Sequence, residues 1–232
     1  NESTIKWLDM ALVKGEVRNA SVVLSGDLSH WPFADKTGRF SARTVLFADE
    51  FKFASDWPVA QNVLLDVDFN GPGFIAEGNT EYLNNSIKLR PSGIASFSKS
   101  DLTIDVNAVS NMQTLLPVLN KTPLKDTVGD LVANLKGNGA VEANVNMFFP
   151  LSKGADFNRT VGTITFKGTD IQSKDLNLSM SKVKGTAKFD NYGFSATELQ
   201  ASMDKNSVKF GVRVGAKHVS NSANHIEADQ HP

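Results

Sequence analysis

The sequence predicts a mainly β protein: a curled antiparallel β-sheet forming an open groove, or β-sandwich-like modules, with short helices between two β blocks. Three observations predict this fold class. Apolar and polar residues alternate in many short segments, turn-forming residues separate these segments, and one set of motifs occurs twice, about 120 residues apart. Alternation with a period of two is typical of strands with one buried face. A repeat this long indicates a repeated β module rather than a solenoid turn.

The two copies of the repeat share glycines and aromatic turns at corresponding places. The matched segments are 13–15 with 135–137, 31–33 with 149–151, 38–40 with 162–164, and 69–74 with 189–194. Repeated β modules form long continuous surfaces, which suit an elongated ligand better than a single point of chemistry.

The first element is an N-terminal helix, residues 1–14. Ile5, Leu8 and Leu12 share one face, with Trp7 and Ala11 beside them, and Gly15 is expected to end the helix.

The first β block follows at 15–109, where the period changes to two. Its clearest strand places Val63, Leu65, Val67 and Phe69 on one face and Asp66, Asp68 and Asn70 on the other. Turn-formers such as 71–73, 84–85 and 91–93 separate the strands, and these short connections imply antiparallel hairpins.

A helical connector is expected at 110–134, a second β block at 135–216 and a disordered polar tail at 217–232. Pro117 lies inside the helical pattern and Pro123 can begin a new helix, so the connector is expected to hold two short helices. The chain is expected to form roughly thirteen strands, which would extend about 60 Å side by side. Whether the two blocks share one sheet, and whether the groove is open or sealed, remain open from the sequence.

Composition excludes several classes of protein. The 24 basic and 25 acidic residues nearly balance, which argues against a nucleic-acid partner. The absence of cysteine excludes disulfides, thiolate zinc sites and a cysteine nucleophile. No apolar stretch approaches the 18 residues of a membrane-spanning helix. We expect both ends of the chain to be cut edges, with any signal sequence or membrane anchor outside it.

The search for catalytic motifs finds little. The histidines, His30, His218, His225 and His231, lack metal-site spacing, and no nucleophile elbow or phosphate-binding loop is present. Asp66 and Asp68 could pair as acid and base, but their alternation with apolar neighbours places them on the solvent side of a strand. We therefore predict no catalytic residue, metal or cofactor. An enzyme ranks third, after the two functions described below.

The motifs resemble a known family. The segments 7–17, 24–28, 31–33 and 38–40, and in the second half 122–124, 135–139, 149–151 and 161–168, are similar to the central repeat region of the AsmA-like envelope proteins of Gram-negative bacteria, most closely the YhdP type, which are related to TamB-like proteins. This resemblance implies a periplasmic segment of a longer chain that is anchored in the inner membrane elsewhere. It also implies a bridge-like conduit whose apolar β groove carries phospholipid between the inner and outer membranes.

The predicted function is therefore non-enzymatic lipid transport, with the inward strand positions as the groove lining. An exposed 16-carbon chain costs about 12 kcal/mol in water, so a carrier must offer unbroken apolar lining. The predicted lining residues are Phe40, Leu65, Val67, Phe69, Leu102, Ile104, Val106, Val145, Met147, Ile164, Phe166, Phe189, Phe210 and Val212. The alternative is a structural or adhesion β module with a closed core and no ligand. Lipid head group, direction of transport, partner proteins and oligomeric state are not predicted.

Overall fold

The computed structural model describes residues 2–31, 33, 35–125, 134–151, 158–174, 177–203, 206–214 and 225–229. These residues form thirteen strands, two α-helices and one short 3-10 helix. The helices are α1 (Glu2–Ala11), η1 (Leu28–His30) and α2 (Met112–Lys121). The first block has the strands β1 (Leu12–Ser25), β2 (Arg39–Phe51), β3 (Ala60–Asn70), β4 (Gly73–Tyr82), β5 (Asn85–Ile94) and β6 (Asp101–Asn111). The second has β7 (Leu135–Asn138), β8 (Ala140–Pro150), β9 (Arg159–Ser173), β10 (Leu178–Asp190), β11 (Gly193–Met203), β12 (Asn206–Val214) and β13 (His225–Asp229).

All the described strands belong to one antiparallel sheet, so the two blocks share a single sheet. The order is β1 to β6 and then β8 to β13, while the short β7 pairs with β9 beside this path. The blocks meet where β6 pairs with β8, from Asp101–Pro150 to Asn111–Ala140, without a register shift. The mainly β, antiparallel fold class is therefore confirmed.

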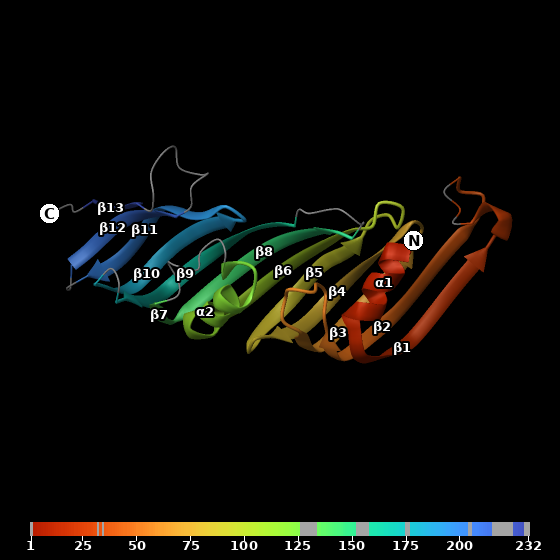
Figure 1. Cartoon of the computed structure of the whole chain (residues 1–232), viewed down its shortest axis with the longest axis horizontal. Helices are drawn as coiled ribbons and strands as arrows, with labels where there is room; N and C mark the ends of the chain where they lie inside the picture. Colours follow the sequence, from red (N-terminus) through yellow and green to blue (C-terminus); the bar gives the residue numbers. More distant parts are fainter. Residues whose placement is uncertain are drawn as a thin grey trace.

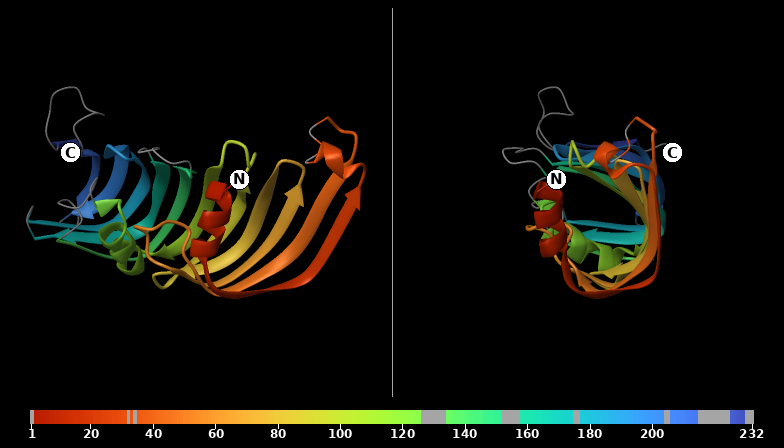
Figure 2. Two further views of the ribbon diagram at one scale, coloured as in Figure 1. Left: turned by 45° about the vertical axis from the view of Figure 1, so that its right-hand side comes forward. Right: turned by 90° about the vertical axis from the view of Figure 1, so that its right-hand side faces the viewer.

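The sheet is elongated and curled, and it is not closed into a barrel. The strands follow one another along the long axis of the molecule, with β1 and β13 at opposite ends (Figure 1). Viewed along that axis, the sheet curves around a central region, and α1 and α2 lie on its open side (Figure 2). We call the concave side, on which the helices lie, the inner face, and the convex side the outer face.

β-bulges interrupt several of the strand pairs. Register shifts interrupt the pairing of β1 with β2, β3 with β4, β5 with β6, and β9 with β10. Asn19, Asn62, Gly93 and Lys182 lie at these shifts and have positive φ angles. An extra residue in a left-handed conformation bends its strand and increases the local twist. A strand bent in this way can curve around the inner face.

The helix α1 differs from its predicted form. It ends at Ala11 rather than near residue 14, because Leu12 already pairs with Phe51 of β2. The face that packs is also narrower than predicted. Trp7 and Ala11 are buried, whereas Ile5 and Leu8 are 59% and 40% exposed.

The connector agrees with its predicted first helix. Asn111 caps α2, its side chain accepting a hydrogen bond from the Gln113 N–H, and Pro117 lies inside the helix. Of the predicted second helix only 123–125 is described, and its remaining residues lie outside the described part of the chain.

The repeat is visible in matching hairpins. Phe69 pairs with Phe74 across the β3–β4 turn, and Phe189 pairs with Phe194 across the β10–β11 turn.

The predicted tail contains one described strand, β13, which pairs with β12 although the sequence predicts disorder at 217–232. The free backbone groups of an edge strand offer a template for such pairing, whatever the side chains are.

Candidate functional site

The inner face of the sheet carries one continuous apolar cluster. Its buried members run from Trp7 in α1 to Phe210 in β12, and every strand from β2 to β6 and from β8 to β12 contributes at least one. Because successive residues of a strand point to opposite faces, each strand supplies every second side chain to this cluster. The arrangement is a long apolar lining on the concave side of one sheet.

Thirteen of the fourteen predicted lining residues lie on this inner face, as their burial and cross-strand pairing show. Nine of them are buried: Leu65, Val67, Leu102, Ile104, Met147, Ile164, Phe166, Phe189 and Phe210. Four are partly buried and pack against the cluster: Phe69, Val106, Val145 and Val212. Phe40 lies outside the cluster, with its ring centroid 4.9 Å from that of Trp31. Contact of these residues with a ligand stays a prediction.

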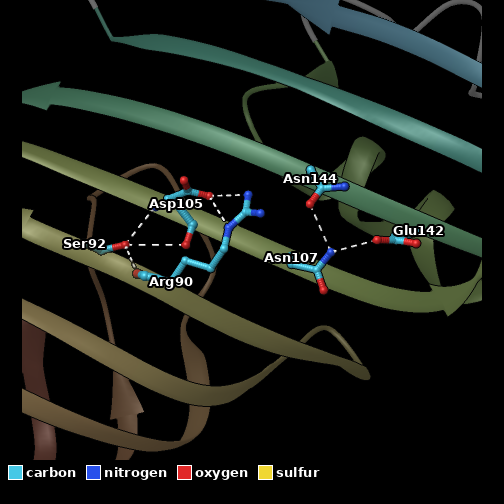
Figure 3. A network of polar contacts seen from close by, with 6 residues as sticks. All are labelled: Arg90, Ser92, Asp105, Asn107, Glu142 and Asn144. Carbon is cyan, nitrogen blue, oxygen red and sulfur yellow. Dashed lines mark hydrogen bonds and ion pairs between the residues drawn. The ribbon is translucent and has the colours of Figure 1, made fainter.

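The outer face is polar and is held together by cross-strand pairs. Near the junction of the blocks, the Arg90 Nε donates to Asp105 Oδ1 at 2.8 Å. Asn107 donates to the side chains of Glu142 and Asn144 from across the β6–β8 pair (Figure 3). The hydrogen bond from Lys167 lowers the pKa of Glu142, and the one from Asn107 adds to this effect. Such pairs are typical of a solvated face that stabilises the sheet.

The outer face also holds the carboxylates that the sequence singled out. Asp66 is exposed, and Asp68 forms an ion pair with Arg43 at 3.0 Å. His30, away from the sheet, is exposed at the end of η1, with its Nδ1 2.7 Å from Asp35 Oδ2. Among the described residues, no group of three or more acidic or histidine side chains could hold a metal ion. These contacts are those of a surface and do not converge on a reactive point.

Two segments close part of the open side over the first block. One is α1, whose Trp7 ring stacks on Phe74 and meets Phe51 edge-on, at 6.4 and 6.2 Å between centroids. The other is the β2–β3 loop, residues 52–59, which we call the strap. The two are joined, because Trp7 Nε1 donates to the Phe53 carbonyl and the Lys52 N–H donates to the Ala11 carbonyl, both at 2.7 Å.

The strap places two aromatic rings between strands that are not neighbours in the sheet. The Phe53 ring lies 6.3 Å from that of Tyr82 at the end of β4 and 5.9 Å from that of Phe149 on β8. Trp57, which is buried, meets both Phe53 and Phe149. The strap therefore lies over the inner face between β4 and β8.

A small apolar cavity remains beneath this cover. Its volume is about 170 Å³, and six of the predicted lining residues border it: Leu65, Leu102, Ile104, Val106, Val145 and Met147. Trp7, Phe53, Trp57 and residues of α2 border it from the open side. A cavity of about 150 Å³ is known to hold benzene, so this space matches a fragment of about six carbons and not a whole acyl chain.

Tyr82 supplies an unusual polar group to the same cavity. The residue is 8% exposed, and its hydroxyl oxygen is buried without a hydrogen-bond partner among the described residues. Burial raises the pKa of the phenol, and the negative charge of Asp56 adds to this effect, so the hydroxyl stays protonated and able to donate. Leaving such a group unpaired costs roughly 1–3 kcal/mol.

Sequence reasoning missed the residues that cover the inner face. Phe53, Trp57 and Tyr82 were not predicted as part of the site, and neither was the packing of α2 through Leu115 and Val118. A usable signal was present in the segment 51–57, because three large aromatic residues, Phe51 at the end of a strand and Phe53 and Trp57 in the loop after it, need a surface on which to be buried.

Comparisons with known proteins identify a relative and a family. The chain is 26% identical over 219 residues to the protein named "Intermembrane phospholipid transporter YhdP" from Escherichia coli (strain K12). The match covers 92% of this chain but 17% of that protein, so the chain spans about a sixth of its relative's length. No solved structure matches. None of the described helices is both long and apolar enough to cross a membrane.

The family model described as "YhdP protein" matches residues 1–229, nearly the whole chain. The curled antiparallel sheet is the first of the two forms that the sequence predicted, with β-sandwich-like modules as the other. The chain belongs to the YhdP protein family.

Proposed function

We propose that this chain is a segment of a longer envelope protein and that its inner face shelters the acyl chains of phospholipids as they pass between membranes. The observation that carries the proposal is the unbroken apolar cluster along an open, curled sheet with a polar outer face. An acyl chain can lie along such a lining while its head group stays in water at the open side. The relative's role as an intermembrane phospholipid transporter supports the same lipid class.

The proposal includes the cellular setting. The segment would lie in the periplasm, and the rest of the chain would anchor it to the inner membrane and reach the outer membrane. It would carry out no chemical step, because passage of a lipid along a groove makes and breaks no covalent bond. The predicted lining residues would contact lipid in this role.

Site-specific photocrosslinking in the whole protein tests the proposal. A photoreactive amino acid at Ile104 or Phe166, on the inner face, should form phospholipid adducts that mass spectrometry detects. The matched controls are Thr103 and Lys167, which adjoin these positions and lie on the outer face. They should form few adducts.

The alternative of a closed structural module predicts a different result. A spacer with a sealed core should form no lipid adduct at either inner position, and organic-solvent extraction of the purified protein should release no phospholipid. Either that outcome or equal adducts on both faces would refute the proposed groove.

A further inference from the structure

We propose that the strap, residues 52–59, occupies a lipid-holding position, and that a phospholipid displaces it and accepts a hydrogen bond from the Tyr82 hydroxyl. This inference rests on the proposed function and adds a specific place and a specific contact within the groove. The lipid atom that Tyr82 would meet is an ester or phosphate oxygen.

The first step of the argument is the size of the cavity. Its volume of about 170 Å³ suits a six-carbon fragment, whereas an acyl chain is more than twice as long. The rings of Phe53 and Trp57 lie between β4 and β8, where the chain would have to pass. A lipid can therefore occupy this part of the inner face only if the strap moves.

The second step is that few interactions tie the strap down. Its described backbone hydrogen bonds to other segments come from Lys52 alone, and Trp7 adds one side-chain bond to Phe53. Its other contacts with the inner face are apolar and come from the rings of Phe53 and Trp57 and from the partly buried Ala54. An acyl chain can replace ring contacts with an apolar surface, because such contacts are not directional in the way hydrogen bonds are.

The third step is the unpartnered hydroxyl of Tyr82. It lies more than nine-tenths buried, lines the cavity and faces the strap through the contact with Phe53. Tyr82 is also the last residue of β4, and the turn that follows is exposed at Asn84. Aromatic residues that lie between an apolar interior and water are typical of sites that contact the ester and head-group region of lipids. Tyr82 has such a position.

Together these observations describe two states of one site. Without lipid, Phe53 and Trp57 cover the inner face and the Tyr82 hydroxyl is unpaired. With lipid, the acyl chain takes the place of the rings, and an ester or phosphate oxygen accepts the hydrogen bond. The lipid thus replaces the apolar contacts of the strap and adds the hydrogen-bond partner that the strap does not provide.

The test combines photocrosslinking with conservative variants of the whole protein. A photoreactive residue at Val63, which borders the cavity, reports lipid beneath the strap, and one at Phe166 reports lipid elsewhere on the inner face. Tyr82→Phe should lower the phospholipid adduct at Val63 about fivefold, the effect of one hydrogen bond of ~1 kcal/mol, and leave that at Phe166 unchanged. Trp57→Ala should raise the adduct at Val63, and Ser55→Ala, an exposed strap position, should change neither.

Lipid-free stability provides a readout that separates a lipid contact from a structural one. Tyr82→Phe should leave the midpoint of chemical unfolding unchanged or higher, because it removes an unpaired buried hydroxyl. A lower midpoint, or an unchanged adduct at Val63, would overturn this inference while adducts at Phe166 still support the groove. No adduct at either position would overturn the proposed function itself.

Discussion

Asn85 is a buried polar residue on which the packing of α2 depends. Its side-chain amide donates to the carbonyls of Tyr82, Leu83 and Thr114, and it accepts a hydrogen bond from the Ser110 hydroxyl. These partners come from the end of β4, the β4–β5 turn, β6 and α2. The side chain of Asn85 therefore joins the first turn of α2 to the edge of the sheet beside the cavity.

Replacing Asn85 with Ala should destabilise the chain by about 2–3 kcal/mol, because buried carbonyl and hydroxyl groups lose their partner. Chemical denaturation measures this change, and hydrogen exchange should show the largest loss of protection in α2. Asn79→Ala, on the exposed outer side of β4, should alter stability by less than about 0.5 kcal/mol. Equal effects at the two positions would show that the Asn85 network does not anchor the helix.

At the scale of elements, the strand pattern was predictable and the covering segments were not. Val63, Leu65, Val67 and Phe69 recur at every second position, and Asp66, Asp68 and Asn70 lie opposite them, so the sequence alone predicts which face is buried even though Leu64 is also apolar. The bulges are harder to predict, because Asn62 and Lys182 interrupt the alternation by only one residue. The position of the strap depends on contacts with Tyr82 and Phe149, which are distant in sequence, and no local pattern encodes such contacts.

The bulge in β10 predicts that replacement by glycine changes the stability of the chain in opposite directions at two nearby lysines. Lys182 has a φ of 56°, a conformation that costs a residue with a Cβ about 1–2 kcal/mol. Lys182→Gly should therefore stabilise the chain by about 0.5–1 kcal/mol. Lys184→Gly, at an exposed position of the same strand without positive φ, should destabilise it by a similar amount. Thermal or chemical unfolding measures both, and a destabilising Lys182→Gly would show that the positive φ of Lys182 carries no such cost.

The whole molecule is a series of strands, and this arrangement has a consequence for transport. Each strand from β2 to β12 along the main path of the sheet adds one step to the apolar lining, so a lipid that travels its length must pass every one. The repeat and the alternation were sufficient to predict an apolar face on each strand, but they left open whether the two blocks share one sheet. They could not show how nearly the side chains fill the concave side, because that depends on how tightly the bulged strands curl.

A charge at any one position of the lining should therefore stop passage through the whole protein. Val106→Asp in β6 and Val212→Asp in β12 suit this test, because both side chains are only partly buried and the chain is more able to fold with the change. If the carboxylate leaves about five methylenes of the lipid without apolar contact, the barrier rises by about 4 kcal/mol, or about a thousandfold in rate. Transfer of a labelled phospholipid between donor and acceptor membranes measures the loss.

The controls follow from the same geometry. Val109→Asp makes the same chemical change on the same strand as Val106→Asp, but at an outer position that is 63% exposed, and it should leave transfer intact. The double variant with Asp at both 106 and 212 should transfer phospholipid at a rate within a few fold of that of the slower single variant. One interruption already blocks a path in series. Normal transfer by a folded Val106→Asp protein, confirmed by circular dichroism, would show that lipid does not travel along this face.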